Sequence, residues 1–322
     1  MSTTVTVIIP TYNRAEILRQ TLEGYAKQAG DHRILEIVVV DDGSKDHTRE
    51  VVAEASSLQQ IPLRYFYQQN AGLAAARNHA IREARGELLL FGDDDIIPSQ
   101  GLTAEHVRAH NADPAEEVGI LGYVPWLPQK NPTPFMDWSS HYGPQFNFGY
   151  FSREKALGFQ HGYFCNTSIY KSFLEKHGIF DETFKTYGYE DIELSYRLCK
   201  HGYKIVYSPE AIGYHNKFET FDDTLLRVKK LYNSWPEFSK TEAGGRFLEL
   251  WREHRARTGR GSQSPAKRIA RPIKNTMVPL FRRMIDTHIP FPNWIYEQVF
   301  YHYVTSFETV VSSQQLKRSA VI

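Results

Sequence analysis

The chain has 322 residues, of which 41% are hydrophobic and 23% charged, an ordinary composition for a globular protein and unlike that of a disordered or fibrous one. No apolar run reaches the roughly 20 residues that cross a bilayer. Two cysteines, Cys165 and Cys199, suggest neither a disulfide framework nor a cysteine-rich metal site. Residues 5–9 lack the basic region and cleavage pattern of a signal peptide, so we expect a cytoplasmic location.

The net charge of +1 hides an asymmetry along the chain. Residues 246–322 carry thirteen Lys and Arg against five Asp and Glu, a net charge of +8, which leaves −7 on residues 1–245. A basic tail favours an anionic partner such as a membrane surface. No nucleic acid is expected as a partner, although charge alone does not exclude one.

Apolar runs alternate with helical periodicity through the first hundred residues. Strands are predicted at residues 5–9, 35–40, 63–67 and 88–91, with a helical pattern after each of the first three. Asn13 and Glu16 fit a capping box before the first helix, and Asp46 can cap the second. Right-handed crossovers between such strands build a parallel sheet whose strand carboxyl ends share one edge.

The fourth predicted strand leads directly into Asp93, Asp94 and Asp95. Adjacent carboxylates repel one another, and they are tolerated together mainly where a cation neutralises them. At the end of a buried strand they lie where open α/β sheets bind ligands; the alternative is a solvated acidic turn. The chain has no GxGxxG and no GxxxxGK[ST] motif, which argues against a dehydrogenase or a kinase.

A second pair of carboxylates, Glu190 and Asp191, begins a helical pattern over residues 190–199. Acidic residues at a helix N-terminus are stabilised by the helix dipole, so capping alone would explain them. A carboxylate at the start of a rigid helix can also act as a general base. Between the two acidic groups, residues 118–160 are rich in aromatic side chains, which either recognise an acceptor or pack within a loop-rich region.

Four motifs follow one another in the first third of the chain: VIIPTYNR (7–14), VVVDDGSKD (38–46), NAGLAAARN (70–78) and FGDDD (91–95). Together they resemble family 2 glycosyltransferases of the GT-A fold, and the resemblance extends to about residue 216. It implies an α/β fold of GT-A type, a Rossmann-like, mostly parallel sheet flanked by helices. The expected organisation is a nucleotide-sugar-binding half (1–100), an acceptor-binding and catalytic half (101–220) and a mainly helical, basic extension (221–322).

The resemblance also implies roles for individual residues. Asp191 becomes the general base, and Glu190 helps to bind the acceptor. The implied donor-binding residues are Pro10, Thr11, Asn13, Asp41, Asn70, Gly72, Arg77, Asp93 and Asp94. Among these, Asp41 would hold the nucleotide base, Asp93 the ribose or donor sugar, and Arg77 the phosphate or sugar, unless Arg77 forms a surface salt bridge.

Asp95 and His215 are the implied ligands of a divalent metal, Mn²⁺ or Mg²⁺. A neutral imidazole beside carboxylate oxygens suits Mn²⁺ better than Mg²⁺. Which member of the aspartate triplet ligates the metal directly is open, and sequence spacing does not show that His215 lies near it.

The implied reaction is inverting transfer of a sugar from a nucleoside diphosphate sugar, with a UDP-sugar favoured. The acceptor is a hydroxyl of a saccharide, a lipid-linked sugar or another molecule, in the synthesis of cell-surface polysaccharide or glycoconjugate. One alternative is a sugar nucleotidyltransferase, which usually carries a basic Gly-rich loop where this chain has PTYNR. The other is a non-catalytic nucleotide-sugar-binding protein, which would lack the base or the metal carboxylates.

The resemblance says nothing about the tail. Residues 221–251 are predicted to be helical and residues 256–266 to form a linker. Beyond the linker, one face carries Ile269, Ile273, Met277, Leu280 and Met284 among basic residues. Such a segment can lie on the inner face of an anionic membrane, or it can pack against the catalytic domain or a second subunit. Aromatic residues at 291–307 could equally form a contact in a homodimer.

Overall fold

The computed structural model describes residues 3–28, 34–58, 60–257 and 277–304. The chain divides into two compact units. The first, here the sheet unit, comprises Met1–Asn131, Tyr150–Phe218 and Ser234–Phe247. The second, the helical unit, comprises Pro132–Gly149, Glu219–Asn233 and Leu248–Ile322. These boundaries differ from the functional halves expected from the sequence, which remain predictions.

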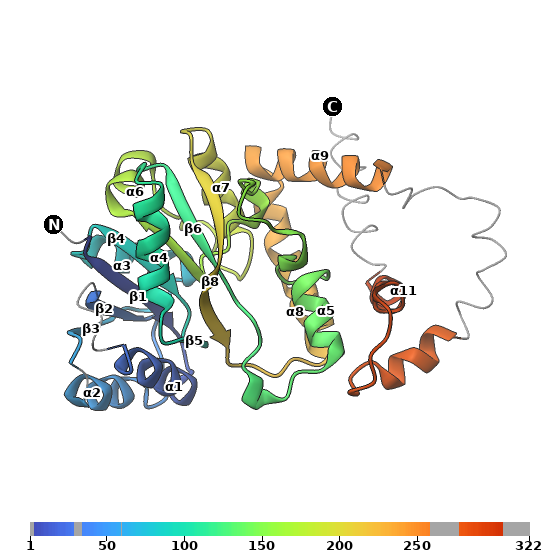
Figure 1. The fold of residues 1–322 in the computed structure, drawn as a ribbon, viewed down its shortest axis with the longest axis horizontal. Helices are drawn as coiled ribbons and strands as arrows, with labels where there is room; N and C mark the ends of the chain where they lie inside the picture. Colours follow the sequence, from blue (N-terminus) through green and yellow to red (C-terminus); the bar gives the residue numbers. More distant parts are fainter. Residues whose placement is uncertain (1–2, 29–33, 59, 258–276, 305–322) are drawn as a thin grey trace. The chain divides into compact units, whose positions relative to one another are not determined.

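The sheet unit is built on eight strands in the order β3-β2-β1-β4-β7-β6-β8-β5 (Figure 1). Four parallel neighbours come first: β1 (Val5–Thr11), β2 (Ile34–Asp41), β3 (Leu63–Tyr67) and β4 (Leu88–Gly92). An antiparallel strand, β7 (Asn166–Tyr170), joins β4 to the parallel pair β6 (Val118–Tyr123) and β8 (Lys204–His215). The short β5 (Ile96–Pro98) pairs antiparallel with β8. The predicted α/β architecture with a mostly parallel sheet is confirmed.

Helices pack against the sheet because each buries an apolar stripe on it. The sheet unit contains α1 (Ala15–Ala26), α2 (Thr48–Leu58), α3 (Leu73–Glu83), α4 (Leu102–Ala112), α6 (Lys171–His177) and α7 (Glu190–Cys199). Short 3₁₀ turns lie at Pro128–Lys130, Phe148–Tyr150 and Phe159–His161. One core joins α1, α2 and α4 to alternate residues of β1, β2 and β4, and its members include Leu18, Leu22, Tyr25, Leu88 and Leu102. Along α7 the buried apolar residues are Leu194 and Leu198, whereas Ile192 and Tyr196 are only half-buried.

The start of α1 is stabilised differently from the prediction. Asn13 and Glu16 do not form a capping box, because Asn13 adopts a left-handed backbone conformation with a φ of 53°. Instead, the carboxylate of Asp46 accepts hydrogen bonds from the backbone N–H of Ala15 (3.0 Å) and of Thr48 (3.2 Å). One side chain therefore holds the first residues of both α1 and α2.

The helical unit has a core of its own. It contains α5 (Pro134–His141), α11 (Asn293–Tyr303), a helical stretch at 277–284 and parts of α8 (Phe221–Phe238) and α9 (Glu242–Arg257), two helices that have residues in both units. The buried apolar residues of this unit are Phe135, Trp138, Phe221, Val278, Ile285, Ile295, Tyr296, Val299 and Phe300. The expected helical extension is thus confirmed for the described residues, with two helices rather than one over 221–257.

Most of the predicted linker and the first part of the basic segment lie outside the described residues. Within the described part, Met277 is 39% exposed and Leu280 51% exposed, whereas Val278 and Ile285 are buried. The predicted apolar face at Met277 and Leu280 therefore does not pack inward.

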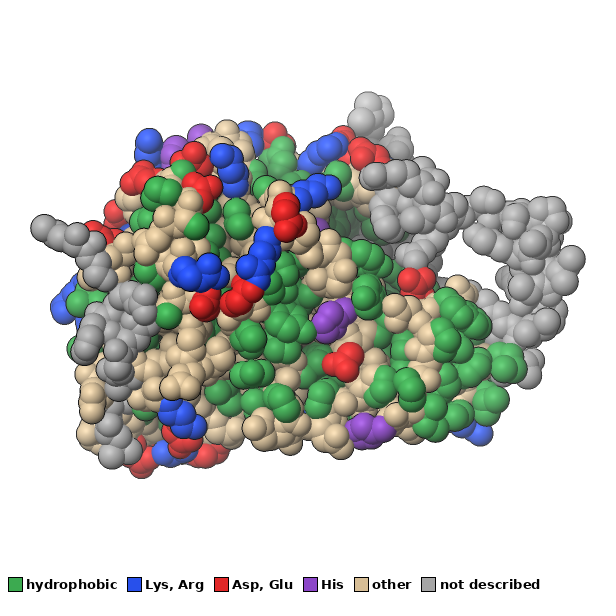
Figure 2. Space-filling view, in the orientation of Figure 1, with side chains coloured by type: hydrophobic (Ala, Val, Ile, Leu, Met, Phe, Trp, Pro, Cys, Tyr) green, Lys and Arg blue, Asp and Glu red, His purple; other side chains and the backbone are tan. Residues whose placement is uncertain are grey.

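On the molecular face in Figure 2, acidic and basic side chains intermingle over the sheet unit. No helix among the described residues could span a membrane; surface contact by the tail stays a prediction that binding to anionic vesicles would test.

A buried polar network connects α4 with the sheet. His106 Nδ1 and His110 Nε2 lie 2.8 and 2.9 Å from the hydroxyl of Ser168, and His106 Nε2 lies 2.9 Å from Asn166 Oδ1. Asn166 donates in turn to the backbone carbonyls of Tyr123 and Ala211. Burial lowers the pKa of His106 to about 4 and, together with the neighbouring His106, that of His110 to about 3. The fold therefore holds both imidazoles neutral.

This network predicts a loss of stability in acid. The unfolded chain binds protons at these histidines below a pH of about 6.5 while the folded chain does not, so the free energy of unfolding falls as pH decreases from there toward the folded pKa values. Each histidine contributes a slope of up to about 1.4 kcal/mol per pH unit in this window. Urea denaturation at pH 7.0, 6.0 and 5.0 measures the slope.

A His110→Phe variant removes one of the two titrating groups and is expected to flatten the pH dependence. His288, whose side chain is exposed, offers the control variant His288→Gln, which should keep the wild-type slope. An equal slope in His110→Phe and wild type would contradict the assignment.

Candidate active site

The candidate site lies at the edge of the sheet where the parallel strands end. β1, β2 and β4 end at Thr11, Asp41 and Gly92, and β7 begins opposite Gly92 at Asn166. β8 ends at His215, paired with Ile96 just after the aspartate triplet. Because β7 runs antiparallel to its neighbours, its first residues meet the last residues of the others. The topology thus brings together loops that are up to two hundred residues apart in the chain.

Two glycines allow the loops after β2 and β3 to pack closely. Gly43 has a φ of +91°, and a Cβ there would lie 2.8 Å from the backbone nitrogen of Asn70. Gly72, at the N-cap of α3, has a φ of +95°, and a Cβ added there would lie 3.2 Å from the carbonyl oxygen of Lys185. Side chains are disfavoured in this left-handed region, so both positions favour glycine. Asp42 ties the same loops by accepting from the backbone N–H groups of Ala71 and Gly72, at 2.8 and 2.9 Å.

The predicted base-binding residue, Asp41, is only 1% exposed. One carboxylate oxygen accepts from the backbone N–H of Ser44 and the other from the hydroxyl of Tyr65, each at 2.7 Å. In the described structure Asp41 therefore holds the loop after β2 and the neighbouring strand. Asn13, by contrast, is exposed, with its backbone N–H bound to the hydroxyl of Ser44.

The aspartate triplet forms a turn whose three side chains have different neighbours. Asp94 is nearly buried; it accepts from the hydroxyl of Thr11 (2.8 Å) and pairs with the guanidinium of Arg14 (2.6 Å). The same guanidinium reaches Asp95 Oδ2 at 2.7 Å. Asp93 is the most accessible of the three, with 29% of its side chain exposed. The alternative of a solvated acidic turn is therefore wrong for Asp94 and Asp95.

Arg77 lies at the centre of the site, only 2% exposed. Its guanidinium donates to Asp191 Oδ1 (2.5 Å), to Asp93 Oδ1 (3.1 Å) and to the backbone carbonyl of Phe164 (2.9 Å), and it lies 3.6 Å from Glu190. The surface salt bridge considered from the sequence is therefore wrong. One buried cation joins Asp93 of the β4 turn to the two carboxylates of α7 and offsets the cost of holding these charges away from water.

α7 begins in a strained turn. Gly188 and Tyr189 both have positive φ, 108° and 71°, and a left-handed conformation is costly for a residue other than glycine. Tyr189 is held there by packing: its ring stacks on Phe238 at 4.5 Å with an interplanar angle of 5° and contacts the ring of Trp235 edge-on. This turn directs the first residues of α7 toward Arg77.

The two carboxylates of α7 are not equivalent. The Glu190 side chain is 6% exposed and accepts from the backbone N–H of Gly188, and burial followed by the charge of Asp191 raises its pKa to about 7. Asp191 is 22% exposed and is oriented by Arg77 and by the backbone N–H of Phe164 (3.1 Å). Burial raises the pKa of Asp191, and the Arg77 guanidinium opposes this shift. Of the pair, Asp191 is thus the group that a second molecule can reach, and burial argues against direct acceptor contact by Glu190.

His215 lies next to Asp95. Its Nε2 is 3.4 Å from Asp95 Oδ2, and its ring stacks on Trp126 at 4.9 Å with an interplanar angle of 6°. His215 and Asp95 therefore lie close together, which sequence spacing alone does not show. Burial would raise the pKa of Asp95, but His215 and Arg14 outweigh it and hold that pKa below the ordinary range.

The residues present fit a divalent cation with few protein ligands. Among the described residues, no three His, Cys, Asp or Glu side chains converge as a metal cage. Asp95 Oδ2 and His215 Nε2, however, are 3.4 Å apart, and neighbouring ligands of an octahedral ion with bonds of about 2.1 Å are separated by about 3 Å. An ion bound by one or two side chains takes its other ligands from substrate phosphates and water.

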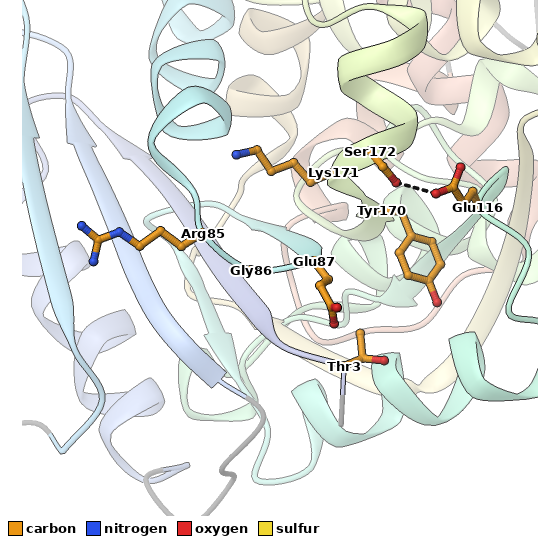
Figure 3. A pocket seen from close by; sticks show the side chains of 8 residues that line it. All are labelled: Thr3, Arg85, Gly86, Glu87, Glu116, Tyr170, Lys171 and Ser172. Carbon is orange, nitrogen blue, oxygen red and sulfur yellow. Dashed lines mark hydrogen bonds between the residues drawn. The ribbon is translucent and has the colours of Figure 1, made fainter. Parts of the chain in front are cut away.

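A separate pocket of about 430 Å³ lies at the opposite edge of the sheet (Figure 3). Its lining residues are Thr3, Arg85, Gly86, Glu87, Glu116, Tyr170, Lys171 and Ser172. Several of its polar groups already bind within the protein: Glu116 accepts from Ser172 at 2.8 Å, and Lys171 donates to the carbonyl of Ala84 at 2.6 Å. None of its residues belongs to the carboxylate site.

Sequence reasoning missed three contributors to the site. Arg14 and Asp42 stand within quoted motifs, but nothing in their spacing showed which partners they bind. Phe164 contributes only backbone atoms, and no residue pattern marks such a role. Within the described part of the chain, two predicted residues, Pro10 in β1 and Asn70 in the loop before α3, make no polar side-chain contact that assigns them a role.

The residues from 6 to 178 match the model of glycosyl transferase family 2, more than half of the chain. The protein belongs to this family. It is 32% identical over 235 residues to validoxylamine A glucosyltransferase from Streptomyces hygroscopicus subsp. jinggangensis, covering 65% of this chain and 54% of that enzyme. The chain thus spans about half the length of this relative.

Solved structures agree on the fold. A mannosyltransferase from Pyrobaculum calidifontis, in complex with GDP-Man and Mn²⁺, superimposes with a TM-score of 0.58 at 19% identity, covering 94% of this chain and 88% of that one. S. aureus TarS 1–349 with UDP-GlcNAc superimposes with a TM-score of 0.51 at 18% identity, covering 74% and 67%. The GT-A fold expected from the motifs is therefore confirmed.

The central position of Arg77 predicts a large effect on stability. Arg77→Met leaves the buried side of Asp93 and Asp191 without a cation, and breaking a buried ion pair in this way costs about 3–5 kcal/mol of unfolding free energy. Urea denaturation at pH 7 measures it.

Arg82 provides the matched control, since it lies on the same helix with a side chain 57% exposed and 3.7 Å from Glu182. Arg82→Met should change stability by no more than about 0.5 kcal/mol. Similar losses in the two variants would refute the central role of Arg77.

Proposed function

We propose that this protein transfers a sugar from a nucleoside diphosphate sugar to an acceptor hydroxyl, with inversion and with Asp191 as the general base. The observation that carries the proposal is the pairing of Asp191 with Arg77 beside Asp93. An accessible carboxylate on a rigid helix start is fixed next to the turn where the family binds its donor. A 2.5 Å contact to a buried cation favours the ionised form of that carboxylate, which is the form a base requires.

The proposed steps assign one task to each group. Asp93, 29% exposed, binds the ribose or donor sugar, and the loop held by Thr11, Asn13 and Asp42 surrounds the nucleotide. Asp191 accepts the proton of the acceptor hydroxyl as that oxygen bonds to the anomeric carbon and the diphosphate leaves on the opposite side. Arg77 orients Asp191 and is a positioning residue rather than a donor ligand, because both terminal nitrogens of its guanidinium are already engaged.

Asp95 and His215 are the proposed ligands of the divalent metal, Mn²⁺ in preference to Mg²⁺ because of the imidazole. The bound ion would act as a Lewis acid toward the charge that develops on the diphosphate. Mn²⁺ accompanies the nucleotide sugar in the Pyrobaculum structure, which supports this choice.

A UDP-sugar is the first candidate donor, since TarS was solved with UDP-GlcNAc, and a GDP-sugar is the second, after the GDP-Man of the mannosyltransferase. The proposed acceptor is a saccharide or other hydroxyl compound in the synthesis of polysaccharide or glycoconjugate. A panel of both donor classes, with Mn²⁺ or with EDTA, tests the proposal. We expect one donor to bind and slowly release its nucleoside diphosphate, and EDTA to lower release at least tenfold.

Product analysis separates the alternatives. Pyrophosphate formed from a nucleoside triphosphate and a sugar phosphate would indicate a nucleotidyltransferase instead. Binding of a donor with neither hydrolysis nor transfer would indicate a non-catalytic binding protein. No binding by the folded protein to any donor would overturn the donor site altogether.

The role of Asp191 predicts a separation of catalysis from binding. Asp191→Asn preserves the size of the side chain but cannot take a proton, so transfer should fall by about 10²–10⁴-fold. The donor dissociation constant, measured by calorimetry, should stay within about threefold of wild type. Loss of donor binding together with transfer would contradict the assignment.

Glu193→Gln is the control for this experiment. Glu193 is a third acidic residue in the first turn of α7, with a side chain 8% exposed, but it pairs with Arg197 rather than with the site. Transfer by this variant should remain within about threefold of wild type.

A further inference from the structure

Asp95 Oδ2 has two neighbours in the described structure. His215 Nε2 lies 3.4 Å from it, and Arg14 Nη2 donates to it at 2.7 Å. The other terminal nitrogen of the same guanidinium donates to Asp94 Oδ1 at 2.6 Å. The oxygen that would hold a divalent cation together with His215 therefore already carries a cation supplied by the chain.

The two arginines of the site differ in their freedom to move. Arg77 is 2% exposed and is also anchored to the carbonyl of Phe164, so its guanidinium is fixed. The Arg14 side chain is 36% exposed, and among the described residues it donates only to the two aspartates. Asp94 and Asp95, with side chains 5% and 11% exposed, cannot leave the site themselves. Arg14 is thus the member of this cluster that can turn out to solvent.

The location of Arg14 supports this difference. It precedes α1 as its N-cap residue, yet its side chain makes no capping bond. The first backbone N–H of α1 is held by Asp46 instead. Release of the Arg14 side chain would therefore leave the helix start intact.

We propose that Arg14 is a resident counter-cation of the metal site, which pairs with Asp95 in the donor-free protein and which a divalent cation must displace. This inference rests on the proposed metal-dependent function. Arg14 then lowers the affinity of the empty site for metal, because each binding event must break a charge-assisted bidentate bridge. The site retains an ionised, oriented Asp95 without metal, since the guanidinium supplies the charge that two buried carboxylates need.

Titration with Mn²⁺ alone, followed by electron paramagnetic resonance of the free aquo ion, tests the competition without any turnover. Arg14→Met should bind Mn²⁺ at least about tenfold more tightly than wild type, since loss of a charge-assisted hydrogen bond is worth at least that factor. Arg14→Lys keeps the charge but lacks the planar fork whose two terminal nitrogens each bind one carboxylate, so an intermediate affinity is expected. Equal or weaker binding by both variants would overturn the proposal.

Arg19 supplies the matched control. It lies on the same helix with a side chain 32% exposed and pairs with Glu54, away from the site. Arg19→Met should bind Mn²⁺ as wild type does. Adding Asp95→Asn to Arg14→Met should abolish the gain; if tight binding persists, the ion lies elsewhere and the proposal fails.

A final arm repeats the titration with UDP present. If neither wild type nor Arg14→Met binds Mn²⁺ with or without UDP, the proposed metal dependence itself fails. If wild type binds Mn²⁺ with UDP but removal of Arg14 does not strengthen binding of Mn²⁺ alone, only the counter-cation role fails. Urea denaturation of Arg14→Lys verifies that the comparison is made on folded protein.

Discussion

Carboxylates gathered at one edge of a sheet repel one another, and burial raises the free energy of each charge further. In this protein the turn after β4 and the start of α7 bring five of them together, and Arg77 neutralises the three that lie between these two elements, Asp93, Glu190 and Asp191. A guanidinium suits the task because it is always charged and offers donors in several directions. Arg77 donates to carboxylates from two elements that lie far apart in the sequence: the turn after β4 and the helix that begins at Glu190.

Backbone geometry then sets the direction of each side chain. The positive φ angles at Gly43 and Gly72 let two loops close on Asp42, and those at Gly188 and Tyr189 direct α7 toward the same edge. Strain in such turns persists only where packing compensates it. The rings of Trp235 and Phe238 do so for Tyr189, so a residue outside the site helps to determine its geometry.

The first hundred residues could be predicted well because β1, β2 and β4, parallel strands buried on both faces, appear as continuous apolar runs. The edge strand β3 is also predicted at its observed bounds, although most of its residues are only half-buried. The contacts between residues far apart in the sequence could not be predicted. The approach of His215 to Asp95 depends on β5, a strand of three residues that no periodicity reveals. The burial of Arg77 runs against the usual exposure of charged side chains, so a surface salt bridge was a reasonable alternative. The capping box failed because Asp46, a residue of the next loop, replaced Asn13 as the local hydrogen-bond acceptor.

Among the described residues of the site, the charges do not balance. Asp93, Asp94, Asp95, Glu190 and Asp191 face the guanidinium groups of Arg14 and Arg77. Burial raises the pKa of Asp94 to about 8 and, with the charge of Asp191, that of Glu190 to about 7, so both carry only part of their charge near neutral pH. A deficit of about one to two positive charges is then left. It rises to about two to three when Arg14 turns out to solvent, and a divalent cation would then largely offset it. A diphosphate donor would bring negative charge back, so a site holding both metal and donor still requires the fixed cation Arg77. Arg77 stays fixed and preserves the geometry of the base Asp191. Arg14 can be released from Asp95, so the charge of the site can change when ligands enter.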